Sequence, residues 1–301
     1  MTKTLASPAQ SAPAALTEAA GRLRETAVLL LRLRESPLAL LGAIVVFIMT
    51  VAAILAPYLV THDPVAQNIS NQLAPPGLTH LLGTDHLGRD VWSRLVWGAR
   101  VSMEVGFVSV GFGMALGIPL GAIAGYYGGR TDRILMRLMD AFLAFPGILM
   151  ALTIVAILGV SLTNTMLAIG IVYIPRFARL IRSSVLTERT LEYVEACRSV
   201  GQAEILILFT QVLPNCLSPL LVQSSVFFAF SVVTEASLSY LGLGNPPPNP
   251  SWGLMLNEAR PFMEDLPRLA ILPGLAISFA TLGFNLFGDG LRDILDPKTY
   301  D

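Results

Sequence analysis

The side chains best suited to metal or acid–base chemistry lie close together in one polar stretch of the sequence. His62, His80 and His86 all fall between residues 60 and 90, and Asp85 directly precedes His86. Three or four converging histidines and carboxylates can bind Zn²⁺. The six-residue step from His80 to His86 and the lack of a fourth ligand give this reading little support, so we predict no metal site.

Two further chemistries lack the motifs they require. HExxH and GxSxG are absent, and no base is expected within an apolar segment, so a hydrolytic site is not indicated. Lys3 and Lys298 are the only lysines, and neither ends a GxxxxGK[ST] run. We therefore predict that the chain is not an enzyme by itself and holds no cofactor. If ATP drives its work, ATP and Mg must be bound by a partner subunit.

The composition is that of a membrane protein. The 301 residues are 53% hydrophobic and 14% charged, with a mean hydropathy of +0.64, whereas soluble domains carry about 25% charged residues. The net charge of −1 says little about partners and gives no sign of a nucleic-acid partner. The two cysteines, Cys197 and Cys216, indicate no disulfide framework. We predict an all-α polytopic membrane protein.

Six apolar segments are long enough to cross a bilayer: residues 38–60, 101–129, 136–159, 163–184, 216–240 and 269–288. Before them, residues 1–16 resemble a disordered tail without a cleaved signal sequence. A basic amphipathic helix over 16–35 would lie on the membrane surface or in solvent, and both readings stay open. The proline-rich loop 242–267 cannot be one continuous helix.

Basic residues set the expected orientation. With both termini in the cytoplasm, most of the 20 lysines and arginines lie on the inner side. Arg176, Arg179 and Arg182 then mark the inner end of the fourth span, where their long side chains reach the interface. We expect a multi-pass protein of the cytoplasmic membrane.

Charged and small residues within the spans have structural explanations. The acidic residues near predicted span ends suit interfacial or interhelical hydrogen bonds better than chemistry; they are Glu104, Asp140 and Glu235. Glycines at a four-residue step share one face of the second span, where another helix can approach closely; they are Gly113, Gly117, Gly121 and Gly125.

A polar island, residues 193–215, separates the fourth and fifth spans. Charged residues alternate with apolar ones there, Gly201 suggests a turn between two short helices, and Pro214 closes the stretch. A solvated loop and a docking surface for a partner are both consistent with this pattern. The pattern alone favours the solvated loop.

The spacing within the island resembles the EAA motif of bacterial ABC importer permeases. Matching positions are Glu195, Ala196, Gly201, Leu213 and Pro214, while Cys197 and Gln211 depart mildly from the motif. In that family the loop forms a coupling helix that fits a cleft of the ATPase subunit. The resemblance thus favours docking. It implies that Glu195 makes a charge-assisted contact with the ATPase and that Gly201 supplies a turn where a Cβ would crowd.

Residues 81–102 resemble the C-type permease subunit of dipeptide and oligopeptide importers. The shared elements are LLGTD, GRD, SRL and GAR, and further similarity covers residues 124–137, 235–244, 250–256 and 284–297. Nickel importers resemble this subfamily too. The outer-loop residues that match the signature of this subfamily are Asp85, Gly88, Arg89, Asp90 and Arg94.

Physical chemistry gives these outer-loop residues a local role. Asp85 and Asp90 can cap helix starts, and Arg89 can pair with either carboxylate. Contact with an extracytoplasmic binding protein is the alternative.

The resemblance implies an ABC type I importer permease with six transmembrane helices. Its expected partners are a homologous permease, two ABC ATPase subunits, an extracytoplasmic binding protein, the lipid bilayer and a peptide. The expected divisions are residues 1–37 (tail and lead-in helix), 38–100 (first span and outer loop), 101–290 (core, with coupling loop 186–214) and 291–301 (tail).

Two other classes of membrane protein would leave different patterns in the sequence. An ion-coupled secondary transporter would need ionisable residues near the midplane and often an inverted repeat, and an intramembrane enzyme would need a base. Neither pattern is clear in the sequence. The cargo stays open among dipeptides, longer peptides, glutathione-like compounds, haem and chelated nickel.

Overall fold

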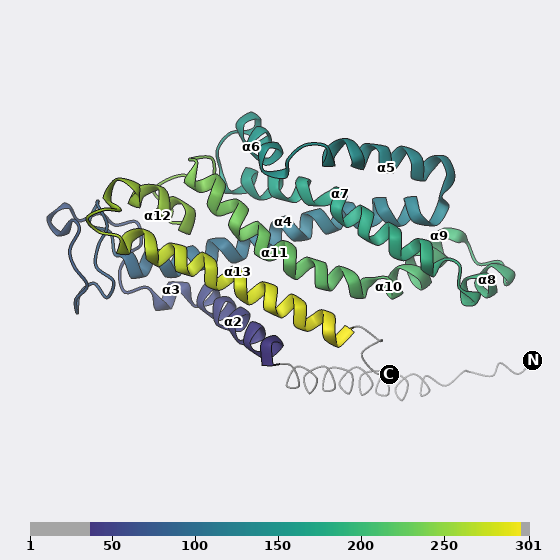
Figure 1. Cartoon of the computed structure of the whole chain (residues 1–301), viewed down its shortest axis with the longest axis horizontal. Helices are drawn as coiled ribbons and strands as arrows, with labels where there is room; N and C mark the ends of the chain where they lie inside the picture. Colours follow the sequence, from purple (N-terminus) through teal and green to yellow (C-terminus); the bar gives the residue numbers. More distant parts are fainter. Residues whose placement is uncertain (1–36, 296–301) are drawn as a thin grey trace, which may run out of the picture.

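Helices form most of the structure, and most of the long ones run along one axis of the molecule; the structure, a computed structural model, describes residues 37–295 (Figure 1). Within that range the only β pairing is an isolated bridge between Thr84 and Asp90. The longer helices are α2 (Pro37–Ile54), α4 (Val91–Tyr127), α5 (Gly129–Leu143), α6 (Gly147–Leu158), α7 (Leu162–Glu188), α11 (Leu217–Tyr240) and α13 (Arg268–Leu295). The short ones are α3 (Ala56–Leu59), α8 (Glu192–Ser199), α9 (Glu204–Ile207), α10 (Leu213–Asn215) and α12 (Trp252–Ala259).

Five helices are long and apolar enough to span a membrane: α2, α4, α7, α11 and α13. A sixth span exists if α5 and α6 are counted as one, although they meet at an 87° bend. This confirms the prediction of an all-α polytopic membrane protein. The third predicted span, 136–159, was wrong as a continuous helix.

The bend between α5 and α6 has a local cause. Pro146 is the N-cap of α6, and a proline both lacks an N–H and disfavours helical backbone in the residue before it. The helix therefore stops at Leu143 and restarts at Gly147 in a new direction. The charged residues between the second and third predicted spans, 130–135, are part of helix α5.

Helix α4 begins ten residues before the predicted second span. The Asp90 side chain accepts a hydrogen bond from the Ser93 N–H (2.8 Å), which satisfies one of the unpaired donors of the first turn. The proposed lead-in helix 16–35 and most of the N-terminal tail lie outside the described residues. Of the predicted C-terminal tail, residues 291–295 belong to α13.

The glycine stripe of α4 lies against α7. A Cβ built on any of its four glycines would come within 3 Å of an atom of α7, including backbone carbonyl oxygens at Gly117 and Gly125. Only glycine allows the two backbones to approach this closely.

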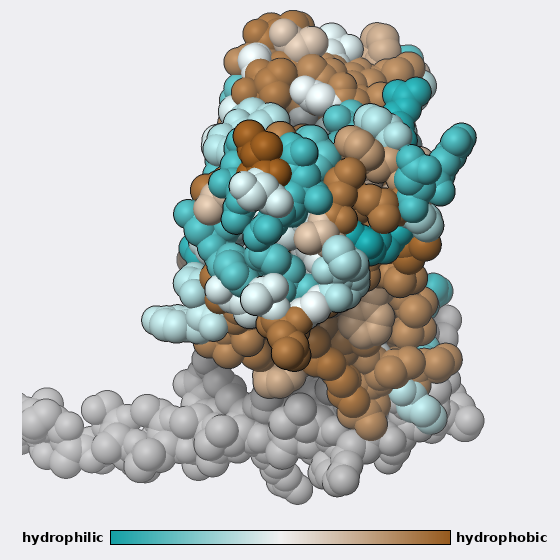
Figure 2. Space-filling model, turned by 90° about the vertical axis from the view of Figure 1, so that its left-hand side faces the viewer, coloured by the Kyte–Doolittle hydropathy of each residue, from teal (hydrophilic) through white to brown (hydrophobic). Residues whose placement is uncertain are grey.

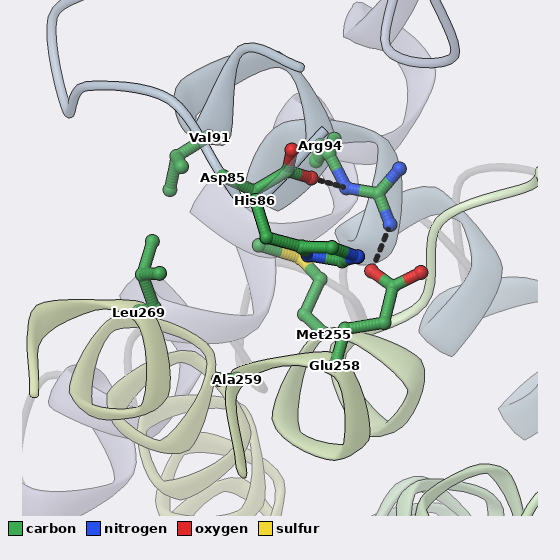
Figure 3. Close-up of a pocket in the computed structure, with 8 residues that line it drawn as sticks. All are labelled: Asp85, His86, Val91, Arg94, Met255, Glu258, Ala259 and Leu269. Atoms are coloured by element: carbon green, nitrogen blue, oxygen red, sulfur yellow. Dashed lines mark hydrogen bonds and ion pairs between the residues drawn. The ribbon is translucent and has the colours of Figure 1, made fainter. Parts of the chain in front are cut away.

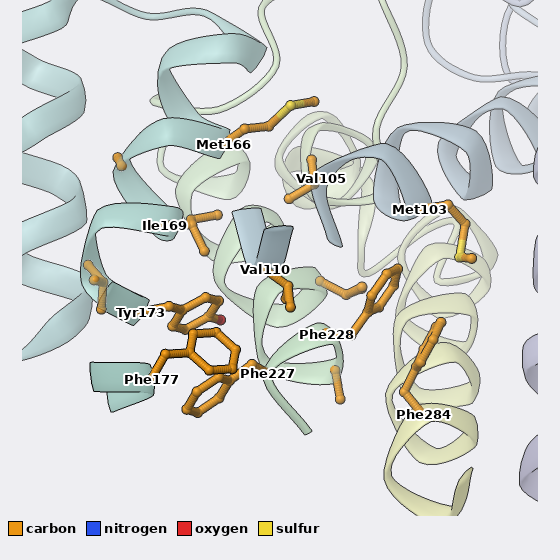
Figure 4. Close-up of a cluster of buried hydrophobic side chains, with 14 of the residues drawn as sticks. Met103, Val105, Val110, Met166, Ile169, Tyr173, Phe177, Phe227, Phe228 and Phe284 are labelled. Atoms are coloured by element: carbon orange, nitrogen blue, oxygen red, sulfur yellow. The ribbon is translucent and has the colours of Figure 1, made fainter. Parts of the chain in front are cut away.

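Aromatic rings also join α7, α11 and α13 (Figure 4). Tyr173 stacks on Phe227 with ring centroids 4.8 Å apart, and Phe177 meets Phe227 edge to face at 5.0 Å. Phe228 stacks on Phe284 of α13 at 3.9 Å. Stacked and edge-to-face pairs of this kind contribute to the packing of the helices that carry them.

The two ends of the long axis are built differently. Residues 60–90 and α12 form one end, called here the loop end, and α8 with α9 forms the other (Figure 1). Figure 2 views the loop end face on, where hydrophilic residues gather with hydrophobic surface beside them. The bundle between the ends carries many exposed apolar side chains, as a lipid-facing or subunit-facing surface would.

Candidate functional site

The first candidate site is the elbow, defined here as α8, α9 and the turn between them. Gly201 forms this turn with a φ of +78°, and its N–H donates to the carbonyl oxygen of Arg198 (2.9 Å). The two short helices with a glycine turn are as predicted. The crowding explanation is wrong, because a Cβ at Gly201 would meet no atom of the described chain within 4 Å. The left-handed backbone is what favours glycine here.

Arg198 is the centre of the charges in the elbow. Its guanidinium donates to Glu195 (3.0 Å) and Glu204 (3.2 Å) and lies 5.7 Å from the ring centroid of Tyr126. The Tyr126 hydroxyl donates to Glu204, and this bond, together with Arg198, holds the pKa of that carboxyl below its usual value. Since Tyr126 belongs to α4, the elbow is tied directly to the end of the longest helix.

The elbow is anchored on one side and open on the other. Val194 and Ile207 are fully buried. Glu195 and Ala196 are exposed, and Val200 is 82% exposed. The elbow therefore has one face packed on the bundle and one face turned to solvent.

The chain leaves the elbow through a π-helical turn, Leu208–Val212, and α10. Leu213 is half-buried and Pro214 is exposed in α10, which ends at Asn215, one residue after Pro214, before α11 begins at Leu217. The Tyr193 hydroxyl donates to Glu188 of α7 (2.9 Å) and accepts from Asn215 (3.3 Å). The elbow thus contacts α4, α7 and α10.

The second candidate site is the loop-end ion cluster, defined as Asp85, Arg89, Arg94 and Glu258. Figure 3 shows Asp85, Arg94 and Glu258 of this cluster. Arg89 donates to Asp85 (2.6 Å) and Glu258 (2.7 Å), and Arg94 donates to the same Glu258 oxygen (2.9 Å). Both arginines are 1% exposed. Glu258 comes from α12, so the cluster joins two segments more than 160 residues apart in sequence.

The two aspartates of the outer loop have different structural roles. Asp90 caps α4, as predicted, while Asp85 caps a turn by accepting from the N–H groups of Leu87 (2.9 Å) and Arg89 (3.0 Å). Gly88 lies in that turn and its N–H donates to the Asp85 carbonyl (3.0 Å). Arg89 pairs with Asp85 and not with Asp90.

The histidines are grouped differently from the sequence expectation. His80 Nδ1 lies 2.9 Å from Asp90 Oδ1, and His62 Nδ1 lies 3.9 Å from the same oxygen. These three could hold a metal ion by spacing, yet hydrogen bonds already account for the position of each Asp90 oxygen. His86 stands apart, stacked on Phe262 at 5.6 Å.

Burial acts to raise the pKa of Asp90, but hydrogen bonds from Ser93 and His80 outweigh it and hold this pKa below its usual value. Asp90 is therefore built to stay ionised.

The acidic residues of the spans have identifiable surroundings. Asp140 of α5 pairs with Arg179 of α7 at 2.5 Å, and Glu104 is exposed on α4. Glu235 is fully buried in α11 and accepts from the Ser239 hydroxyl (2.6 Å). Arg182 pairs with Asp132 (2.6 Å between Nη2 and Oδ2), which with the Arg179 pair fastens α5 to α7.

Arg176 of α7 lies beside aromatic rings, unlike its two arginine neighbours, which pair with acids of α5. It lies about midway along α7, 5.9 Å from the ring centroid of Tyr173 and 5.7 Å from that of Phe227. It lines a cavity of about 230 Å³ between α6, α7 and α11. Nothing in the sequence marked Arg176 apart from its two arginine neighbours.

This architecture defines a helical membrane permease subunit. The model of the family described as "Binding-protein-dependent transport system inner membrane component" matches residues 117–300. A second, "N-terminal TM domain of oligopeptide transport permease C", matches residues 27–76.

Curated relatives agree with the family models. A "Dipeptide transport system permease protein DppC" of Alkalihalophilus pseudofirmus is 44% identical over 89% of this chain and 88% of its own. A "Glutathione transport system permease protein GsiD" of Pectobacterium atrosepticum is 50% identical over 74% of each. The chain belongs to the family of inner membrane components of binding-protein-dependent transport systems, in its dipeptide and oligopeptide C-type branch.

A solved structure supports the fold. An inward-facing MetNI methionine ABC transporter chain superposes with a TM-score of 0.55 at 20% identity, covering 67% of this chain and 97% of that one. The fold is that of an ABC type I importer permease, as the sequence predicted.

Proposed function

We propose that this chain is the permease subunit of an ATP-driven importer that carries peptides, dipeptides or oligopeptides, across the cytoplasmic membrane. Relatives named for dipeptide and for glutathione transport support a peptide cargo. A homologous permease completes the path, two ABC ATPase subunits bind ATP and Mg, and a binding protein delivers the cargo. A nickel or other small-solute importer of the same family is the alternative.

The observation that carries the proposal is the elbow. It presents Glu195, Ala196 and Val200 to solvent on a surface whose other side is tied to α4 through Tyr126 and to α7 through Tyr193 and Glu188. A push on the exposed face therefore reaches two spans at once. In our proposal, ATP-driven closure of the ATPases supplies that push and tilts the spans from inward-facing to outward-facing.

This assignment places the elbow and both termini in the cytoplasm and the loop end outside. The excess of basic residues on the elbow side supports that orientation. The loop-end ion cluster then holds the outer loop in a fixed shape, against which a binding protein would dock.

Gly201→Val in the assembled importer tests the coupling role. A β-branched residue is strained at φ +78° by about 1–2 kcal/mol, so we expect the complex to assemble at normal levels but to lose peptide uptake and peptide-stimulated ATP hydrolysis. Gly201→Asn is the matched control, since Asn tolerates this backbone conformation, and it should keep most uptake. Full uptake by the valine variant would refute the coupling role.

A further inference from the structure

We propose that Arg176 binds the carboxylate of the cargo midway along its path, in the cavity between α6, α7 and α11. This inference rests on the proposed function and names the chemistry by which the permease itself recognises a peptide.

The position of Arg176 is the first observation. The residue lies about midway along a spanning helix and its side chain is exposed. Among residues 37–295 no carboxylate lies within ion-pair distance of it, whereas the next two arginines of α7 each have one. A guanidinium facing hydrocarbon is costly, so this face of the chain meets water or a polar group and not lipid.

The cavity beside Arg176 is the second observation. Its volume is about 230 Å³, and Ile148, Val172 and Phe230 supply apolar lining. This space exceeds what one partner carboxylate would fill and suits a small solute or one end of a longer one.

The third observation is an unused polar group in the same wall. The Tyr173 side chain is 2% exposed, and its hydroxyl makes no hydrogen bond of good geometry within the described chain, although Thr234 lies near it. Buried hydroxyls normally have partners. Tyr173 therefore adds an unpaired hydroxyl to the residues that line the cavity.

The Tyr173 and Phe227 rings also hold the guanidinium. Arg176 lies within 6 Å of both centroids, a distance at which a cation is attracted to a ring. A planar guanidinium held in this way can present two parallel N–H groups to a carboxylate. Every peptide with a free C-terminus carries such a carboxylate, so one residue could serve cargo of varied sequence.

Uptake of a dipeptide and of its C-terminal amide by the complete importer in proteoliposomes tests the proposal. We expect Arg176→Gln to lower uptake of the free dipeptide at least about tenfold, the size of one lost charge-assisted hydrogen bond, and that of the amide less than about twofold. Arg176→Lys should recover part of the loss. Arg179→Gln, which breaks an exposed ion pair, is the control and should leave both substrates nearly unchanged.

An equal loss for both substrates would overturn the proposal, since Arg176 would then pair with a fixed carboxylate of the partner permease. Unchanged uptake of the dipeptide would overturn it too. A wild-type importer that takes up no peptide would refute the proposed function and this ligand with it.

A second measurement does not need the amide to be transported. A benzoylphenylalanine at position 148, which lines the cavity, should cross-link to a radiolabelled dipeptide during turnover, and one at position 157, exposed on the same helix but outside the cavity, should not. Adding Arg176→Gln should abolish the adduct at 148. An adduct that is absent, or equal at both positions, would overturn the proposal.

Discussion

The loop-end ion cluster and the elbow both pair arginines with carboxylates, but these pairs are buried in the cluster and exposed in the elbow. Arg89 and Arg94 are 1% exposed and share Glu258, whereas Arg198 lies near the surface and bridges two exposed glutamates. Removing one partner of a buried ion pair lowers the stability of the fold strongly, because the other charge stays buried without a partner. Removing one partner of an exposed pair lowers it little. One end is therefore built to stay fixed, and the other can rearrange at low cost.

The largest effect expected from this difference is at Glu258. Glu258→Ala leaves two buried arginines facing the single carboxylate of Asp85, so we expect the free energy of unfolding to fall by about 3–5 kcal/mol. Thermal unfolding of the purified complex in detergent measures the change. Glu264→Ala, which removes an exposed acid of the same loop, is the control. Equal shifts for the two variants would show that the cluster is not a fixed point.

A smaller loss is expected at the helix cap. Asp90→Ala removes the acceptor of the Ser93 N–H and the partner of His80, and should cost about 1–2 kcal/mol. Asp90→Asn keeps a capping oxygen and should lose less. If hydrogen exchange at the start of α4 is the same in the two variants, the cap does not stabilise this helix end.

The same aspartate predicts a pH dependence. Because its pKa is lower in the folded chain, its stabilisation is present above the unfolded value of about 3.9 and disappears as the pH falls through the folded pKa. Unfolding temperatures of wild type should therefore drop more steeply than those of Asp90→Asn below about pH 4. Parallel curves for the two proteins would contradict this.

The smallest effect on stability is expected at the elbow. Arg198→Ala should change the free energy of unfolding by less than about 1 kcal/mol, yet reduce the coupling of ATP hydrolysis to uptake, because Arg198 joins the elbow to Tyr126. Measuring both the uptake per ATP hydrolysed and the unfolding temperature of this variant separates the effect on coupling from the effect on stability. A strong loss of stability would mean that the elbow is as rigid as the loop end.

Periodicity and motif spacing predicted much of this architecture. The six apolar segments, the paired short helices around Gly201 and the Asp90 cap all depend on local sequence, and local sequence is what those rules describe. The bend at Pro146 also follows from local sequence, because proline disfavours helical backbone in the residue before it.

The remaining features depend on distant contacts. The pairing of Glu258 with Arg89 and Arg94 joins segments far apart in the chain, and no spacing within either segment indicates it. The same holds for the place of Arg176 beside Phe227 of α11. Its arginine neighbours on α7 differ from it only in the acids that α5 brings to them.

Helix α4 begins in the loop-end region and finishes beside the elbow. At 37 residues it is about 55 Å long, well beyond the roughly 30 Å of a hydrocarbon core. Its first turn is held by the Asp90 cap and by Arg94, and its last by Tyr126 and the Arg189 side chain, which donates to the Tyr126 carbonyl (2.7 Å). In the importer proposed above, a displacement of the elbow would turn α4 about its fixed loop end, and each α4 side chain would move sideways in proportion to its distance from the Asp90 cap.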